Sequence, residues 1–115
     1  MSGYSNGRAY EYKIRDHLIS FGYSCIRAAG SKGKADLVAL RPGEVLLVQV
    51  KMAGLQIAPH ERRGLLELAR ITGGVPLVAH KPDRKPITYR RLTGLGPRDW
   101  EEWKPVDVVL DARVV

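Results

Sequence analysis

The feature that most constrains the fold is an almost uninterrupted apolar run, Val45-Leu46-Leu47-Val48-Gln49-Val50. It follows Arg41-Pro42-Gly43-Glu44, a sequence typical of a hairpin turn. A β-branched and aliphatic run of this length predicts a central strand that is covered on both faces. Other elements must therefore pack on each side of the sheet, which favours an α/β architecture.

Two segments with helical periodicity could supply those covering layers. The first runs from Arg8 to about Phe21 and stops at Gly22, and the second begins near Pro59 and ends near Thr72-Gly73-Gly74. The apolar residues at helical spacing are Tyr10, Ile14, Leu18 and Phe21 in the first segment, and Leu65, Leu66 and Ala69 in the second.

Four further segments are strand candidates, and together with the central run they predict a mixed five-stranded sheet flanked by helices. These four segments are Tyr23–Ala29, Ala35–Leu40, Val75–His80 and Ile87–Arg91. The connection from the central strand to the fourth strand would cross over through the second helix. We expect residues 1–115 to form a single domain, with residues 93–115 as a C-terminal extension.

Charge points to a polyanionic partner. The chain has 115 residues, with nineteen Lys and Arg against twelve Asp and Glu, which gives a formal net charge of +7. Nucleic acid is the expected partner, and membrane binding is disfavoured because the basic residues are not gathered on one amphipathic helix. No apolar run approaches ~20 residues and the first residues do not resemble a signal peptide, so we expect a cytoplasmic protein.

Four polar side chains fall where they could carry chemistry. Asp36 opens one predicted strand, while Gln49 and Lys51 share one face of the central strand. Glu11 is the carboxylate of the first helix that leans toward its apolar stripe. Simpler interpretations remain open, since Lys51 could end its strand in solvent and Glu11 could pair with a nearby cation.

Several consecutive motifs together resemble one family, the archaeal-type Holliday-junction resolvases of archaea and some phages, which belong to the PD-(D/E)XK nuclease superfamily. Their order and spacing agree over roughly residues 7 to 91, and the Arg-x-x-Gly-Ser turn is the most specific among them. The matching segments are Gly7 to Glu11, Gly22 to Gly33, Ala35 to Ala39, Leu47 to Lys51, Arg63 to Ala69 and Gly73 to Ala79.

The resemblance implies a restriction-endonuclease-like fold and a homodimer that cuts four-way DNA junctions, with no small-molecule substrate. It further implies that one or two Mg²⁺ ions, for which Mn²⁺ could substitute, are bound by Glu11, Asp36, Gln49 and the Val50 carbonyl. Lys51 would position or activate the attacking water. The implied DNA contacts are Arg27, Ser31 and Lys32 beside the scissile phosphate, and Lys34, Arg62 and Arg63 along the backbone.

Residue 49 departs from the family, which has glutamate where this chain has Gln49. An amide can offer its oxygen to a metal ion but supplies no charge. Gln49 could be natural in an active enzyme, could mark an impaired junction-binding protein, or could be an engineered substitution. We favour the active variant, because Glu11, Asp36 and Lys51 are all retained. A nuclease of the same fold acting on other DNA substrates is a further alternative.

The remaining candidate residues receive structural interpretations. His17, His60 and His80 share no metal-site spacing, so surface or supporting roles are expected. Trp100 and Trp103 could stack on bases or close the core, and packing is favoured.

Overall fold

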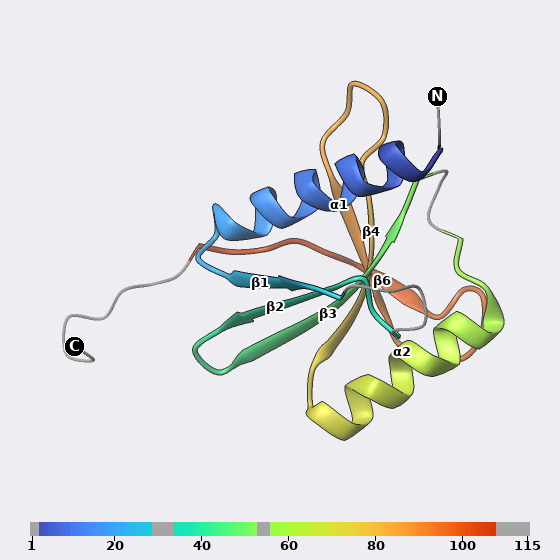
Figure 1. Ribbon diagram of the computed structural model, residues 1–115. Helices are drawn as coiled ribbons and strands as arrows, with labels where there is room; N and C mark the ends of the chain where they lie inside the picture. Colours follow the sequence, from blue (N-terminus) through green and yellow to red (C-terminus); the bar gives the residue numbers. More distant parts are fainter. Residues whose placement is uncertain (1–2, 29–33, 53–55, 108–115) are drawn as a thin grey trace.

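The computed structural model describes residues 3–28, 34–52 and 56–107. Two helices and six strands make up this part of the chain (Figure 1). In chain order they are α1 (Gly3–Ile19), β1 (Ser24–Arg27), β2 (Leu37–Arg41), β3 (Glu44–Lys51), α2 (Pro59–Thr72), β4 (Val75–His80), β5 (Thr88–Leu92) and β6 (Trp100–Trp103).

The strands form one mixed sheet in which spatial order follows chain order, β1-β2-β3-β4-β5-β6. All neighbours are antiparallel except β3 and β4, which are parallel and are joined through α2. The predicted hairpin between β2 and β3 is confirmed, with Arg41 opposite Glu44 and Gly43 at a positive φ of 75°. The apolar run therefore lies inside the sheet, as its composition predicted.

The sixth strand is the difference from the expected five. Trp100–Trp103 pairs with β5 at the sheet edge, where Tyr89 lies opposite Trp103 and Leu92 opposite Trp100. This strand is short and largely exposed. Its sequence, Trp-Glu-Glu-Trp, lacks the apolar run or the clean alternation by which a strand is predicted. Part of the segment that we expected to be an extension is thus built into the sheet.

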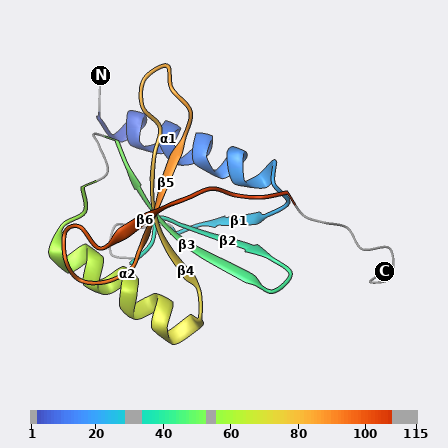
Figure 2. The same ribbon diagram turned by 180° about the vertical axis from the view of Figure 1, so that it is seen from behind.

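Two apolar clusters cover the two faces of the sheet. On one face Ile14 and Leu18 of α1 pack against strand residues that include Val48 and Tyr89. On the other face Leu65 of α2 packs against Leu47 and neighbouring strand residues. Figure 1 and the reverse view in Figure 2 both place α1 and α2 on different sides of the fan of strands. The predicted three-layer α/β arrangement is confirmed.

Both predicted helix stops involve glycine. Gly22 has a φ of 94° and Gly73 a φ of 74°, conformations that a side chain would strain. The Gly73 N–H donates to the Ala69 carbonyl and so ends α2 with a left-handed cap. Among the described residues, neither helix is long and apolar enough to span a bilayer.

Candidate active site

Asp36 lies where β1, β2 and β3 meet. Its backbone N–H donates to the Val48 carbonyl at 2.8 Å, and its own carbonyl accepts from the Ala28 N–H at 2.9 Å. Its side-chain Oδ2 accepts a 2.8 Å hydrogen bond from the Val50 N–H. Both neighbouring strands therefore fix the carboxylate just before the start of β2.

The surroundings of Asp36 disfavour its negative charge. Burial raises the pKa of this carboxyl, and the nearby Glu11 and Glu61 carboxylates raise it further. The Val50 N–H and the Lys51 ammonium act in the opposite direction without cancelling the rise in pKa. Three carboxylates thus lie close enough to interact, an environment in which a bound cation would be stabilised.

Glu11 reaches this region from α1. Its Oε1 accepts a hydrogen bond from Arg27 Nε at 2.6 Å, and both side chains are partly buried. The pair joins α1 to β1. A simple boundary glutamate would also pair with a cation, but this pair places Glu11 beside β1, where Arg27 lies opposite Leu37, the residue after Asp36.

Gln49 points into the protein and is only 7% exposed. Its Nε2 donates a 3.1 Å hydrogen bond to the Lys34 carbonyl, which ties the middle of the sheet to the segment before Asp36. A carboxylate at this position could not donate that bond. With the nitrogen engaged, the amide oxygen is the atom that could serve as a metal ligand.

Lys51 is held by an ion pair that the sequence did not suggest. Its Nζ donates to both carboxylate oxygens of Glu61, at 2.8 and 2.9 Å, and Glu61 Oε1 also accepts from the Ala58 N–H at 3.0 Å. Burial raises the pKa of Glu61, but the hydrogen bonds from Lys51 and Ala58 outweigh it and hold the pKa below its usual value. Lys51 is therefore not a strand-end lysine reaching into solvent.

Glu61 is the site residue that sequence reasoning missed. The sequence pattern that could have revealed it is Pro59-His60-Glu61 at the start of the second predicted helix. A glutamate at the third helical position typically accepts a hydrogen bond from the backbone N–H at the helix start. That pattern places Glu61 at a helix terminus. It does not reveal that the terminus lies beside Lys51, which depends on the crossover from β3 through α2.

The chemistry of these donors fits a hard divalent cation. Glu11 and Asp36 offer carboxylate oxygens and Gln49 an amide oxygen, and Mg²⁺ is commonly held by one or two carboxylates while it keeps several waters. Among the described residues, no group of three or more His, Cys, Asp or Glu side chains is arranged as a metal-binding cluster. The set thus suits a partly hydrated ion better than a closed protein cage.

The expected DNA-contact residues differ in their placement. Lys34 and Arg63 are exposed. Arg62 is only 6% exposed, and its Nη1 donates to the carbonyls of Gly94 and Asp99 at 2.9 and 3.1 Å. The expected backbone contact of Arg62 does not match this burial, because its guanidinium holds the loop before β6 against α2. Ser31 and Lys32 lie outside the described residues.

The histidines have the supporting positions that were expected. His80 Nδ1 lies 3.0 Å from the Lys51 carbonyl oxygen, at the end of the parallel pair β3 and β4. His17 Nδ1 lies 2.9 Å from the Tyr89 hydroxyl, and His60 is exposed. Trp103 packs on the core, with its ring 5.3 Å from that of Tyr89.

Comparison with known proteins identifies a matching family model, a curated relative and a similar solved structure. A family model described as archaeal Holliday junction resolvase (Hjc) matches residues 2–107. The crossover junction endodeoxyribonuclease Hjc of Methanocaldococcus jannaschii is 36% identical over 81 residues, which cover 68% of this chain and 60% of that protein. The chain thus spans about three fifths of the length of this curated relative. The structure of Archaeoglobus fulgidus Hjc, a Holliday junction resolvase from an archaeal hyperthermophile, gives a TM-score of 0.65 at 27% identity, covering 73% of this chain and 70% of that chain.

Proposed function

Because this chain belongs to the archaeal Holliday junction resolvase family, we propose that it is a structure-selective endodeoxyribonuclease that cuts four-way DNA junctions. The observation that carries the proposal is that Asp36 accepts a hydrogen bond from the Val50 N–H, one residue before Lys51, while Glu11 pairs with Arg27 on the neighbouring strand β1. The net charge of +7 supports a polyanionic substrate. Activity on chromosomal or phage DNA would place the protein in the cytoplasm.

The metal site is part of this proposal. Glu11, Asp36, Gln49 and the Val50 carbonyl would hold Mg²⁺, with Mn²⁺ as a substitute, because all four supply hard oxygen atoms. When bound, such an ion polarises a phosphodiester and lowers the pKa of a coordinated water. The hydrogen bond from Val50 N–H keeps Asp36 oriented before any ion arrives, so less ordering is required on binding.

Lys51 would act on the scissile phosphate itself. The bond to Glu61 restrains the Lys51 ammonium at the end of β3. A positive charge beside the scissile phosphate would offset the negative charge that develops during hydrolysis. Fixing the ammonium in advance lowers the entropy lost when substrate binds. Lys51 would thereby position the attacking water or stabilise the transition state.

DNA binding would rest on several cations around the site. Arg27 lies beside Glu11, and Lys34 and Arg63 are exposed, so these three can approach phosphates. We retain Ser31 and Lys32 in the proposal on the strength of the family motif, whereas the buried Arg62 is left out. Contacts of this kind position a backbone without reading its sequence, which suits an enzyme that selects shape.

A homodimer would deliver paired cuts. Two symmetric nicks in a four-way junction require two active sites related by a two-fold axis. A monomeric mass at micromolar concentration, with or without junction DNA, would contradict this part of the proposal.

Gln49 supports a second candidate, a junction-binding protein with an impaired site. Its amide adds no charge for a metal ion, and its nitrogen donates to the Lys34 carbonyl.

A nuclease acting on other DNA is the third candidate. A labelled four-way junction and a linear duplex of matched length, each incubated with Mg²⁺ and with EDTA, separate the three. We expect metal-dependent paired nicks in the junction alone. Binding without nicking would favour the impaired protein, and equal nicking of both substrates would favour the general nuclease.

A further inference from the structure

A cavity of about 190 Å³ lies on the face of the sheet that also carries Gln49 and Lys51. Its lining includes residues of β4, β5 and β6. Gln49 is in register with Val78, and Val78 with Arg90, so these side chains form one row across β3, β4 and β5. At a strand spacing of about 4.8 Å, Arg90 lies roughly 10 Å from Gln49 across the sheet. Duplex DNA advances about 3.4 Å per nucleotide, so the two positions are about three nucleotide steps apart.

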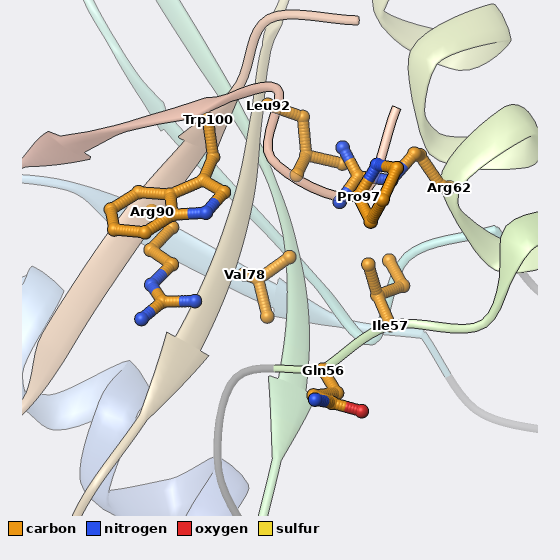
Figure 3. Close-up of a pocket in the computed structure, with 8 residues that line it drawn as sticks. All are labelled: Gln56, Ile57, Arg62, Val78, Arg90, Leu92, Pro97 and Trp100. Carbon is orange, nitrogen blue, oxygen red and sulfur yellow. The ribbon is translucent and has the colours of Figure 1, made fainter. Parts of the chain in front are cut away.

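The cavity has apolar surfaces and a cationic aromatic side (Figure 3). Figure 3 shows Val78 between Arg90 and Trp100 on one side and Ile57 and Pro97 on the other. The Arg90 guanidinium lies over the Trp100 ring, 3.7 Å from its centre, and Trp100 remains 37% exposed. A surface of this kind suits a flat, apolar and polarisable group.

The wall that faces α2 is fixed by internal bonds. Arg62 donates to the Gly94 and Asp99 carbonyls, and the Gly96 N–H donates to Asp99 Oδ2 at 2.8 Å. These contacts hold the loop that carries Pro97 without help from a ligand. The buried Arg62 therefore shapes the cavity, and the cavity is formed in advance.

The charges nearby favour a base over a bare phosphate. Arg90 is absent from the ion pairs formed within the described part of the chain, so its charge is available. However, Glu102 is the register partner of Arg90 on β6 and would repel an anion. The Glu102 charge does not repel a neutral nucleobase in the same way. Every nucleobase offers a π-face that can stack on an aromatic ring or a guanidinium.

We propose that this cavity, the Arg90–Trp100 pocket, binds one unpaired nucleobase of a DNA strand that passes the active site. The inference rests on the proposed function for the origin of that base, because strands change partners at a branch point and bases there cost least to unstack. The pocket would help the protein to distinguish branched DNA from a fully paired duplex. It adds a contact to base surface beside the phosphate contacts already proposed.

A binding experiment in EDTA tests the pocket independently of cleavage. The full-length protein is titrated with fluorescein-labelled oligo-dT and with an abasic strand of the same length and phosphate number. We expect tighter binding of oligo-dT by roughly tenfold, the effect of one stacked base. Trp100→Ala and Arg90→Ala should each remove most of that preference, and Trp100→Phe should retain part of it.

Arg91→Ala is the matched control. Arg91 is the next residue on β5 but belongs to the opposite face of the sheet, where it pairs with Glu101 at 3.6 Å. Its loss should weaken both strands equally and leave the preference for bases intact. Equal binding of oligo-dT and abasic strand by the wild type overturns the proposal even if a variant fails to fold. Loss of the preference in Arg91→Ala to the same extent as in Arg90→Ala also overturns it.

The pocket and the proposed activity can fail separately. If the protein prefers bases but never nicks a junction, the proposed pocket stands and the proposed resolvase function is refuted. If it nicks junctions but binds oligo-dT and the abasic strand equally, the proposed function stands and the proposed pocket is refuted.

Discussion

Lys51 and Glu61 form a bidentate contact, with Nζ at 2.8 and 2.9 Å from the two carboxylate oxygens. The pair joins the end of β3 to the first turn of α2, and both side chains are about three-quarters buried. An ion pair at this depth is screened less by solvent than a surface pair. Its consequence is that the proposed catalytic ammonium has a fixed direction before substrate arrives.

Glu61→Gln should therefore slow nicking by about tenfold, because a neutral amide restrains the ammonium less strongly. Junction affinity should stay equal or rise slightly, since one negative charge leaves a DNA-binding region. Glu67→Gln is the control, because Glu67 lies on the same helix but forms an exposed pair with Arg70. Single-turnover rates that match for the two variants would refute a positioning role for Glu61.

Gln49→Glu should lower stability when no metal is present. The substitution removes the hydrogen bond to the Lys34 carbonyl and turns a carboxylate toward that oxygen, at a cost of about 1–3 kcal/mol. Mg²⁺ should then raise the melting temperature of Gln49→Glu more than that of the wild type. At limiting Mg²⁺, Gln49→Glu should also nick faster than the wild type. Thermal unfolding in EDTA and across an Mg²⁺ titration measures the two effects on stability, and nicking assays across the same titration measure the rate.

Gln56→Glu provides the comparison for that experiment, because Gln56 is an exposed amide outside the proposed ligand set. It should change neither stability nor the response to Mg²⁺. Identical metal curves for Gln49→Glu and the wild type would show that residue 49 does not touch the ion.

Arg62→Ala and Arg63→Ala should fail in different ways although the residues are adjacent. Arg62→Ala leaves the Gly94 and Asp99 carbonyls without their donor and should cost about 2–4 kcal/mol of unfolding free energy. Arg63→Ala should leave stability nearly unchanged, weaken junction binding and reduce the slope of log affinity against log salt by about one. Urea unfolding and binding at several salt concentrations decide the matter. A larger effect of Arg62→Ala on the salt slope than on stability would contradict this division.

His17 should make the protein less stable in mild acid. Burial lowers its pKa in the folded state from the usual value of about 6.5, so the unfolded chain binds a proton more readily. The stability that depends on neutral His17 is complete above pH 6.5 and is lost as pH falls through 6.5 toward the folded-state pKa. His17→Gln should therefore lose less stability than the wild type between pH 7.5 and pH 5. Exposed His60→Gln should behave as the wild type, and equal losses in all three proteins would count against this role.

The fold could be predicted wherever hydrophobic pattern and turn chemistry agreed. The Val45–Val50 run gave the position of β3, and the glycines at 22 and 73 marked two helix ends. β6 could not be found, because Trp100–Trp103 becomes a strand through pairing with β5 and not through its own pattern. Edge strands bury little side-chain surface, so their sequences are weakly constrained.

The candidate site was predictable in part for the same reasons. Alternation placed Gln49 and Lys51 on one face of a strand, but the partner of Lys51 comes from a helix ten residues later. Arg62 and Arg63 show a different obstacle. A helix turns about 100° per residue, so one of two identical neighbours is buried and the other exposed, and which one depends on the packing of α2.

The central claim is that the cluster around Asp36 and Lys51 cuts branched DNA. It is tested most directly by single-turnover nicking of a labelled four-way junction in Mg²⁺ by the wild type, by Lys51→Ala and by the exposed control Lys85→Ala. We predict that Lys51→Ala loses nicking while its junction affinity stays within a few-fold, and that Lys85→Ala nicks as the wild type does. A Lys51→Ala protein that nicks the junction at the wild-type rate would contradict the assignment of this site.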